Sequence, residues 1–338
     1  MLGGMRIAVE WWERHQVVLY LAALVVGAIV GLAAPGVAGP LEPAIAPVLG
    51  LLLYATFLGV PFAAIGRALG DWRFLAAVVA LNFVLVPVIV FGLSRFVAHD
   101  EALLVGVLLV LLTPCVDYVI VFSGLAGGAR DRLLAATLLL MLLQILLLPF
   151  YLWLMAGSDV VGAIDPQPFV AAFLLLIVLP LMLAALTQLL AKRSRAGRAI
   201  ARGASAAMVP LMMITLAVVV ASQIFAVTGS LGRLLAVVPL YVVFVPIAAV
   251  LGAVIGRVAH LDVPARRAVT FSGVTRNSLV VLPLALALPA SFSLTPLVVV
   301  TQTLVELVAM VVMVALVPRF IRADPRTRTA HADGPLAR

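Results

Sequence analysis

The chain has 338 residues, of which 65% are hydrophobic and 11% are charged, and its mean hydropathy is +1.27. A soluble domain carries roughly twice that share of charge, so the composition excludes a soluble globular protein and indicates a polytopic membrane protein. The net charge of +8 does not indicate nucleic-acid binding, because basic residues of membrane proteins gather in cytoplasmic loops. The single cysteine excludes a disulfide framework and a multi-cysteine metal site.

Ten stretches are long and apolar enough to cross a bilayer, which takes about 20 residues. The N-terminal segment before them lacks a cleavable signal pattern, so the first stretch is expected to be retained as a span. The loops between the stretches are short, and the tail after Arg319 is polar, basic and expected to be disordered. In chain order the predicted spans are Gln16–Ala34, Ala44–Gly66, Phe74–Phe96, Ala102–Ala126, Leu133–Ala156, Pro168–Ala191, Ala204–Val227, Leu234–Arg257, Ala265–Leu288 and Leu294–Pro318.

The positions of Lys and Arg test this layout, because these residues are enriched in cytoplasmic loops. With the N-terminus in the cytoplasm, 19 of the 22 basic residues fall on the cytoplasmic side, and only Arg95 and Arg233 fall on the other. Arg276 remains inside a span. The bias predicts ten spans in the inner membrane with both termini in the cytoplasm.

Two of the predicted spans are interrupted at matching positions. Thr113-Pro114-Cys115-Val116-Asp117 interrupts the fourth span, where proline lacks a backbone N–H, and Thr275-Arg276-Asn277-Ser278 interrupts the ninth. Two sets of five spans form an inverted repeat, a common transporter architecture with a midplane site at broken helices. The predicted fold is therefore all-α, with inverted five-span repeats over residues 1–158 and 159–320 and a cytoplasmic tail over 321–338. The alternative is that the two polar interruptions fall at matching positions by coincidence and do not reflect a repeat.

Asp117, Arg276 and Glu306 are the charges within the predicted spans. Charges at that depth are costly and usually face a polar interior, which favours a functional role over a purely structural ion network. Arg276 is placed to neutralise Asp117 across the broken helices. That arrangement would leave Glu306, in the middle of the last span, or whichever carboxylate Arg276 does not hold, to take up and release a proton.

Cys115 follows a proline, so it is expected at the start of a half-helix, where the helix N-terminus favours a thiolate. Its soft sulfur suits a thiophilic solute, and one thiol makes only a weak, reversible bond. The alternative is that this lone cysteine is a small buried hydrophobe. Asn277 and Ser278 begin the second half-helix, whose free N–H groups favour an anion or a polar neutral solute.

The remaining polar residues within spans carry weaker expectations. Thr113, Pro114 and Tyr118 are secondary candidates for the site, and inter-helix hydrogen bonds are expected of Asn82, Gln144, Gln223 and Gln302. The chain has no nucleotide-binding glycine-rich loop, no HExxH and no GxSxG motif. An enzyme or an ATP-driven pump is therefore not expected, and neither is a cofactor.

The chain resembles the bile acid/arsenite/riboflavin transporter superfamily, in particular its arsenite-efflux branch. The motifs that carry the resemblance are the residues at the two breaks, Val121-Phe122-Ser123-Gly124-Leu125-Ala126-Gly127-Gly128, Leu282-Pro283-Leu284-Ala285 and Gln302-Thr303-Leu304-Val305-Glu306-Leu307. The resemblance implies a panel domain and a core domain, with the fourth and ninth helices crossing at the site. It also implies that the thiol matching Cys115 is needed for arsenite and antimonite extrusion, and that the glutamate matching Glu306 acts in proton exchange.

The chain departs from the sodium-coupled bile acid members, which resemble it but have Gln-Asn-Ser where it has Arg276-Asn277-Ser278. They also have a glutamate near the position of Ser272. Loss of that acid and gain of a fixed positive charge disfavour sodium, so the resemblance and this departure together favour proton coupling.

The sequence therefore predicts a secondary transporter that exports arsenite or antimonite in exchange for protons, with a soft contact from Cys115 to trivalent arsenic. The first alternative is a sodium- or proton-coupled symporter of an organic anion, which would use Arg276. The second is a non-transporting receptor or scaffold, which the short loops disfavour. The expected partners are a small solute, protons and the lipid bilayer, with no nucleic acid, and a homodimer is left open.

Overall fold

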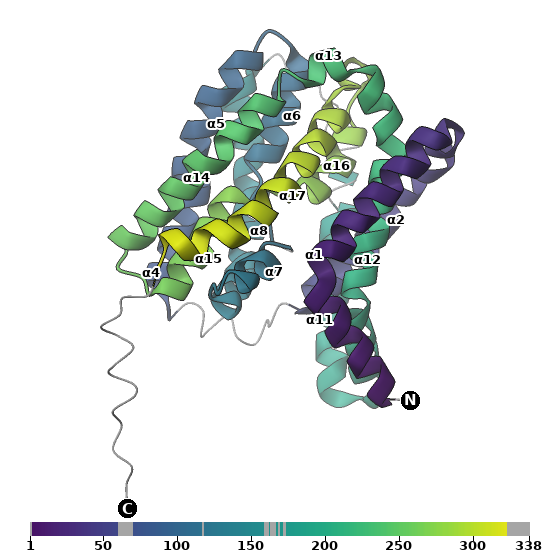
Figure 1. Cartoon of the computed structure of the whole chain (residues 1–338), viewed down its shortest axis with the longest axis vertical. Coiled ribbons are helices and arrows are strands. Elements are labelled where there is room, and N and C mark those ends of the chain that lie inside the picture. Colours follow the sequence, from purple (N-terminus) through teal and green to yellow (C-terminus); the bar gives the residue numbers. More distant parts are fainter. Residues whose placement is uncertain are drawn as a thin grey trace, which may run out of the picture.

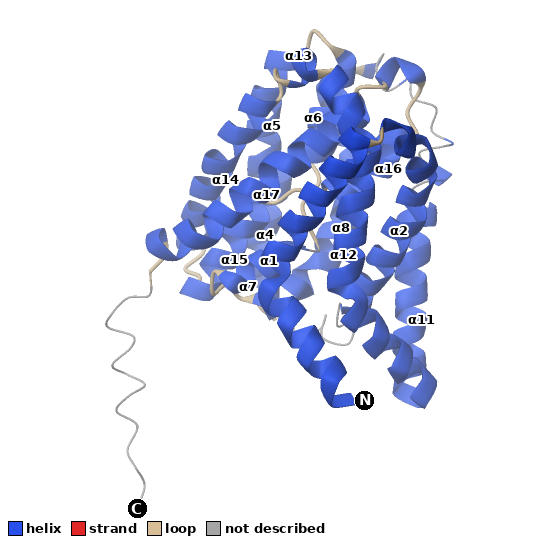
Figure 2. Cartoon of the chain, turned by 45° about the vertical axis from the view of Figure 1, so that its right-hand side comes forward, coloured by secondary structure: helices blue, strands red, loops and turns tan. Residues whose placement is uncertain are grey.

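The computed structural model describes residues 2–59, 70–116, 118–158, 162, 167, 170–171 and 174–322. These residues form helices joined by short loops (Figure 2), and their only β-structure is an isolated bridge between Pro114 and Arg276. Seven helical segments within this part of the chain are long and apolar enough to cross a membrane. The chain is therefore a multi-pass membrane protein.

These seven segments overlap seven of the ten predicted spans, of which residues 60–66, 168–169 and 172–173 lie outside the described residues. They are Pro35–Gly59, Trp72–Val97, Leu139–Ala156, Leu174–Arg193, Arg195–Gly229, Leu231–Val258 and Ala290–Phe320. The first predicted span lies in α1 (Leu2–Ala33), whose apolar part, Val18–Ala33, is shorter.

The other two predicted spans are each divided by a break at the expected place. The fourth consists of α6 (Glu101–Leu111) and α7 (Tyr118–Leu125), and the ninth of α15 (Val263–Val274) and α16 (Ser278–Leu286). Both interruptions read from the sequence are thus present, and they explain why neither span appears as one continuous helix.

The helices pack as two groups, which Figure 1 shows side by side. The first bundle contains α1, α2 (Ala38–Gly59), α11 (Leu179–Arg193) and α12 (Arg195–Gly229). A π-helical turn, Leu174–Val178, comes directly before α11. The second bundle contains α6, α7, α15 and α16 together with α4 (Trp72–Ala80), α5 (Val86–Ser94), α8 (Arg130–Ala156), α14 (Val238–Val258) and α17 (Thr295–Phe320). The bundles meet where α12 contacts α17 and where α2 contacts α16.

Short elements complete the chain. Between α4 and α5 lies a π-helical turn, Leu81–Leu85, and α13 (Leu231–Leu234) connects the two bundles after α12. The 3-10 turns are Pro35–Val37, Arg95–Val97 and Ala290–Phe292.

Small residues allow α1 and α12 to approach closely. A Cβ atom added to Gly31 would lie 2.5 Å from the carbonyl oxygen of Ala221, and one added to Gly27 would lie 2.7 Å from that of Ala217. The spacing of four residues on both helices is the small-xxx-small pattern of membrane helix pairs, in which dispersion contacts replace the hydrophobic effect. This packing holds the first bundle together.

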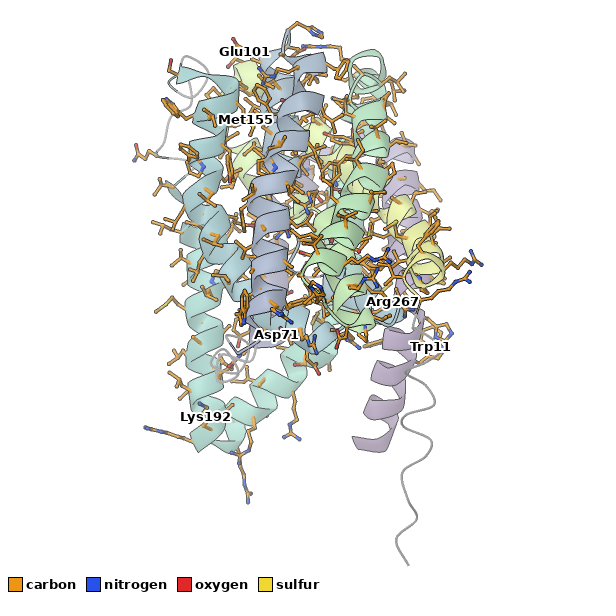
Figure 3. All side chains as sticks on the ribbon, turned by 90° about the vertical axis from the view of Figure 1, so that its left-hand side faces the viewer. Trp11, Asp71, Glu101, Met155, Lys192 and Arg267 are labelled. Carbon is orange, nitrogen blue, oxygen red and sulfur yellow. The ribbon has the colours of Figure 1, made fainter. Side chains whose placement is uncertain are left out.

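Aspartate side chains begin several helices by accepting hydrogen bonds from free backbone N–H groups. Asp71 caps α4, Asp100 caps α6 and Asp262 caps α15. Arg132 of α8 forms ion pairs with both Asp71 (3.3 Å) and Asp262 (2.9 Å), which joins three helices of the second bundle at one end. Asp71, Arg267 and Lys192 lie toward this end and Glu101 and Met155 toward the other (Figure 3), as the alternating layout requires.

Candidate functional site

The two helix breaks meet through backbone hydrogen bonds. The N–H of Asn277 donates to the carbonyl of Thr113 at 2.8 Å, and the N–H of Cys115 donates to the carbonyl of Thr275 at 3.3 Å. Because proline cannot donate, Pro114 ends α6 and leaves its neighbours free to pair with the other break. The result is the short antiparallel bridge between Pro114 and Arg276, deep inside the second bundle.

Glu306 of α17 lies against this crossing and is only 2% exposed. The backbone N–H of Arg276 donates to both of its carboxylate oxygens, at 3.1 and 2.9 Å. The Tyr118 hydroxyl lies 2.6 Å from Oε1, and the Gln302 amide donates to Oε2. A buried carboxylate with this many donors is well satisfied, so the site can hold a negative charge without an ion pair.

The Arg276 side chain is fully buried and has its own set of partners. Its guanidinium donates to the Asn82 side-chain oxygen (2.8 Å) and to the carbonyls of Ser272 (2.6 Å), Gly273 (2.7 Å) and Leu111 (3.3 Å). It also lies over the Phe244 ring, 5.5 Å from the centroid, which adds a cation–π contact. Among the described residues, no ion pair includes Arg276 or Glu306.

Helix ends explain why the two charges lie where they do. The carbonyls that hold the guanidinium belong to the last turns of α6 and α15, where the helix dipole is negative. The N–H that holds Glu306 precedes α16, where the dipole is positive. Breaking both helices therefore creates a place for one cation and a place for one anion.

Asn82 orients the Arg276 guanidinium from the π-helical turn after α4. Its amide donates to the Ser272 hydroxyl at 2.9 Å while its oxygen accepts from Arg276. The turn precedes Pro87, which cannot donate to the Phe83 carbonyl, and the Tyr151 hydroxyl donates to that carbonyl instead. Sequence reasoning expected an inter-helix hydrogen bond of Asn82, which is confirmed, but did not connect it with Arg276.

Several buried polar atoms at the crossing have no hydrogen-bond partner among the described residues. They include Nδ2 of Asn277, the Ser278 hydroxyl and Oε1 of Gln302, on side chains that are at most 3% exposed. The Asn277 oxygen accepts from Val280 N–H and so caps α16. Unpaired buried polar groups are costly, so each calls for a partner such as a bound solute, water or ion.

The structure brings most of the predicted site residues together. Thr113, Pro114 and Cys115 lie in one break, and Arg276, Asn277 and Ser278 lie in or directly after the other, all buried. Glu306 reaches the same point from α17. Asp117 lies outside the described residues, so its predicted pairing with Arg276 stays a prediction. Tyr118 and Gln302 both form hydrogen bonds to Glu306. The sequence shows that they are polar residues within spans, but it does not show which residue they contact.

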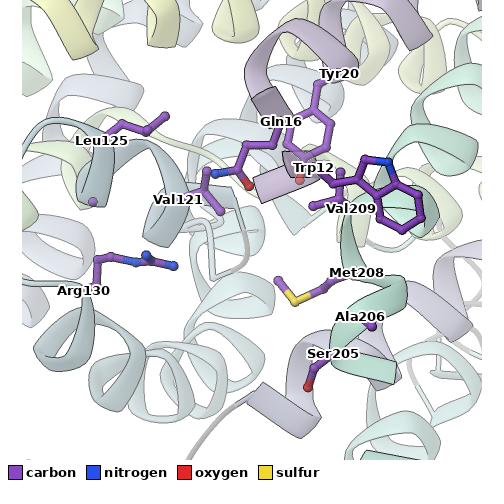
Figure 4. Close-up of a pocket in the computed structure, with 11 residues that line it drawn as sticks. Trp12, Gln16, Tyr20, Val121, Leu125, Arg130, Ser205, Ala206, Met208 and Val209 are labelled. Carbon is purple, nitrogen blue, oxygen red and sulfur yellow. The ribbon is translucent and has the colours of Figure 1, made fainter. Parts of the chain in front are cut away.

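A cavity of about 250 Å³ lies between the two bundles, beside α7. Trp12, Gln16 and Tyr20 of α1 and Met208 of α12 line one side (Figure 4), while Arg130 at the start of α8 lies on the other. The remaining lining residues are Val121, Gly124, Leu125, Ser205, Ala206 and Val209. Val121 is three residues after Tyr118 on α7, so the cavity begins within about one helical turn of the residue that contacts Glu306.

Comparison with known proteins places the chain in a family. A comparison with curated proteins finds no match. A family model described as the sodium bile acid symporter family matches residues 46–230, which include the first break but not the second. Members of this family are transporters and not enzymes. Because the match spans more than half of the 338 residues, the chain belongs to the sodium bile acid symporter family.

Proposed function

We propose that the chain is a secondary active transporter of the inner membrane that exports arsenite or antimonite in exchange for protons. The observation that carries this proposal is the crossing itself. A thiol-bearing break pairs with a second break, and the backbone of that second break holds a buried carboxylate. A thiol, a proton acceptor and unpaired polar groups then lie at one place in the membrane.

The topology that we propose has ten crossings in two inverted repeats, residues 1–158 and 159–320, with both termini cytoplasmic and a tail over 321–338. The seven continuous segments, α1 and the two divided helices together supply ten crossings. The first bundle would then be the panel domain and the second the core domain. Rocking of one against the other would expose the crossing to each side in turn.

We propose protons as the coupling ion, although the family is named for sodium. A sodium ion needs a cluster of oxygen ligands, and carbonyls of Ser272, Gly273 and Leu111 with the Asn82 oxygen make such a cluster. The Arg276 guanidinium already fills it with a positive charge that cannot leave. Among the described residues at the crossing, Glu306 is the group left to bind and release a cation, and a proton is the cation that needs no shell of oxygen ligands.

Trivalent arsenic or antimony is the solute class that Cys115 supports, because a soft sulfur ligand binds a soft centre. Arsenous acid is neutral at physiological pH, and its hydroxyl groups both donate and accept hydrogen bonds. The unpaired Asn277 amide, Ser278 hydroxyl and Gln302 carbonyl offer matching partners. The cavity beside α7 would be the cytoplasmic path to them.

Symport of an organic anion is the second candidate, and one observation favours it. The Arg130 side chain is exposed at the cavity and has no hydrogen bond or ion pair among the described residues, while Trp12, Leu125 and Val209 give the cavity an apolar wall. An anion with an apolar body would fit that lining. This candidate was expected to use Arg276, but both terminal nitrogens of its guanidinium donate to protein oxygens, and Nε is the guanidinium nitrogen without a partner among the described residues.

Flux through Cys115 variants tests the choice of solute. Everted vesicles with the unmodified chain should accumulate trivalent arsenic, whereas Cys115→Ser and Cys115→Ala should not. Ser278→Ala serves as a control that removes a polar contact but leaves the thiol, and it should reduce the rate without abolishing it. Carboxylate uptake that is indifferent to Cys115, with no arsenic transport, would establish the second candidate instead.

A further inference from the structure

The turn between α11 and α12 carries a dense group of exposed basic side chains. This basic elbow consists of Lys192, Arg193, Arg195, Arg198 and Arg202, five cations within eleven residues. The chain has no Asp or Glu between residues 166 and 261, so no acid lies near the elbow in sequence. None of the ion pairs among the described residues includes an elbow side chain.

Local contacts make the elbow rigid. Ser194 begins α12 by accepting a hydrogen bond from the Gly197 N–H at 2.9 Å. A Cβ atom on Gly197 would lie 2.6 Å from the Ala191 N atom, so only glycine lets the two helices meet this closely. The Arg198 guanidinium donates across the turn to the Ala191 carbonyl at 3.3 Å. These contacts fix the backbone of the turn from which the basic side chains extend.

The elbow lies beyond the part of α12 that the hydrocarbon core can cover. The helix has 35 residues and so a length of about 52 Å, against roughly 30 Å for the core of a bilayer. Figure 3 places Lys192 farther from Glu101 and Met155 than either Asp71 or Arg267 lies. Ile200, between the basic residues, is 51% exposed and adds an apolar contact at the same level.

Two other arginines at this end are already engaged within the protein. Arg132 pairs with Asp71 and Asp262, and Arg267 donates to the carbonyls of Ala126 and Ile321. No carboxylate in the described part of the chain pairs with the charges of the elbow, which points to a partner outside the chain.

We propose that the basic elbow binds the anionic head groups of phospholipids at this surface of the bilayer. Clusters of four to eight basic residues directly beside a membrane helix attract anionic lipids, and guanidinium groups bind phosphate oxygens through paired hydrogen bonds. The elbow belongs to the bundle of α1, α2, α11 and α12, so this contact holds that bundle at the lipid surface. The proposal does not depend on which solute the protein carries.

The test measures lipid binding to the full chain in a neutral detergent. The probes are short-chain phosphatidylglycerol, which is anionic, and short-chain phosphatidylcholine, titrated by calorimetry. The triple variant Arg195→Gln, Arg198→Gln, Arg202→Gln should bind phosphatidylglycerol roughly tenfold to a hundredfold more weakly than the unmodified chain. A matched triple, Arg257→Gln, Arg319→Gln, Arg322→Gln, removes three exposed charges elsewhere and should keep the affinity.

The triple variant Arg195→Lys, Arg198→Lys, Arg202→Lys separates charge from folding, because it keeps the charge and should retain most of the binding. Affinity for phosphatidylglycerol should also fall as salt is added. The proposal is overturned if the unmodified chain binds both lipids equally, or if the matched triple loses as much affinity as the elbow triple. Tighter binding of a soluble acidic peptide than of phosphatidylglycerol would assign the elbow to a protein partner instead.

Discussion

The backbone N–H of Arg276 and the carboxylate of Glu306 are joined by a forked hydrogen bond, at 3.1 and 2.9 Å, where two broken helices cross. The guanidinium of the same arginine turns to the helix carbonyls and Asn82. One residue therefore presents its backbone to the anion and its side chain to the helix ends. The first prediction concerns the anion.

Replacing Glu306 should separate its structural role from its role in coupling. Glu306→Ala leaves the Arg276 N–H and the Gln302 amide without their acceptor and should lower the free energy of unfolding by about 3 kcal/mol. Glu306→Gln keeps one acceptor oxygen, so it should fold but not exchange protons. Thermal unfolding and pH-driven flux of both variants test this, with Glu101→Gln as an exposed control. Coupled flux in Glu306→Gln would show that another group carries the proton.

Gly31 should be intolerant of even a methyl group. A Cβ there would lie 2.5 Å from both the Ala221 oxygen and Ile224 Cγ2, so Gly31→Ala should push α1 from α12 and destabilise the protein by about 1–3 kcal/mol. A Cβ atom added to Gly203 on α12 would have nothing within 4 Å of it. Gly203→Ala should therefore stabilise the protein by about 0.5–1 kcal/mol, because alanine has the higher helix propensity. Thermal unfolding of the two variants should thus shift in opposite directions, and equal shifts would contradict the close packing.

Asp100 should make stability depend on acid pH. Partial burial raises the pKa of Asp100. The opposite effect is larger in sum and comes from hydrogen bonds donated by Arg233, Leu103 N–H and Ala102 N–H and from the charge of Arg233, so the pKa lies below its ordinary value of 3.8. A lowered pKa in the folded state adds stability above about pH 3.8, and this contribution is lost as the pH falls through the folded-state pKa. Asp100→Asn keeps the helix cap but not the charge. Unfolding temperatures of the two proteins should differ at pH 6 and converge at low pH, whereas a constant difference would exclude the linkage.

His260 occupies a backbone conformation that favours glycine. Its φ is 55°, and it follows α14, where the His260 N–H donates to the Arg257 carbonyl and the Leu261 N–H to the Gly256 carbonyl. This is the Schellman arrangement, in which glycine is preferred because it has no Cβ. His260→Gly should raise the free energy of unfolding by about 1 kcal/mol, while the β-branched His260→Val should lower it. Denaturant titration distinguishes the two, and a loss of stability in His260→Gly would contradict the strain.

The sequence predicted the features that depend on residue type alone. Pro114 cannot continue a helix, and Arg276 is costly in lipid, so the two breaks could be located before the fold was known. The direction of the Arg276 side chain could not be predicted, because it depends on Asn82, a residue 194 positions away in the sequence. It also depends on the free carbonyls of helix ends, which exist only once both helices are broken. The contact of Tyr118 with Glu306, 188 positions apart, was hidden for the same reason.

Flux of trivalent arsenic in sodium-free proteoliposomes with an imposed pH gradient tests the central claim most directly. The proposed mechanism predicts that arsenite is concentrated against its gradient while the pH gradient lasts, and that Cys115→Ser and Glu306→Gln each abolish this accumulation. Transport that requires sodium and ignores the pH gradient, or that survives in Cys115→Ser, would contradict it.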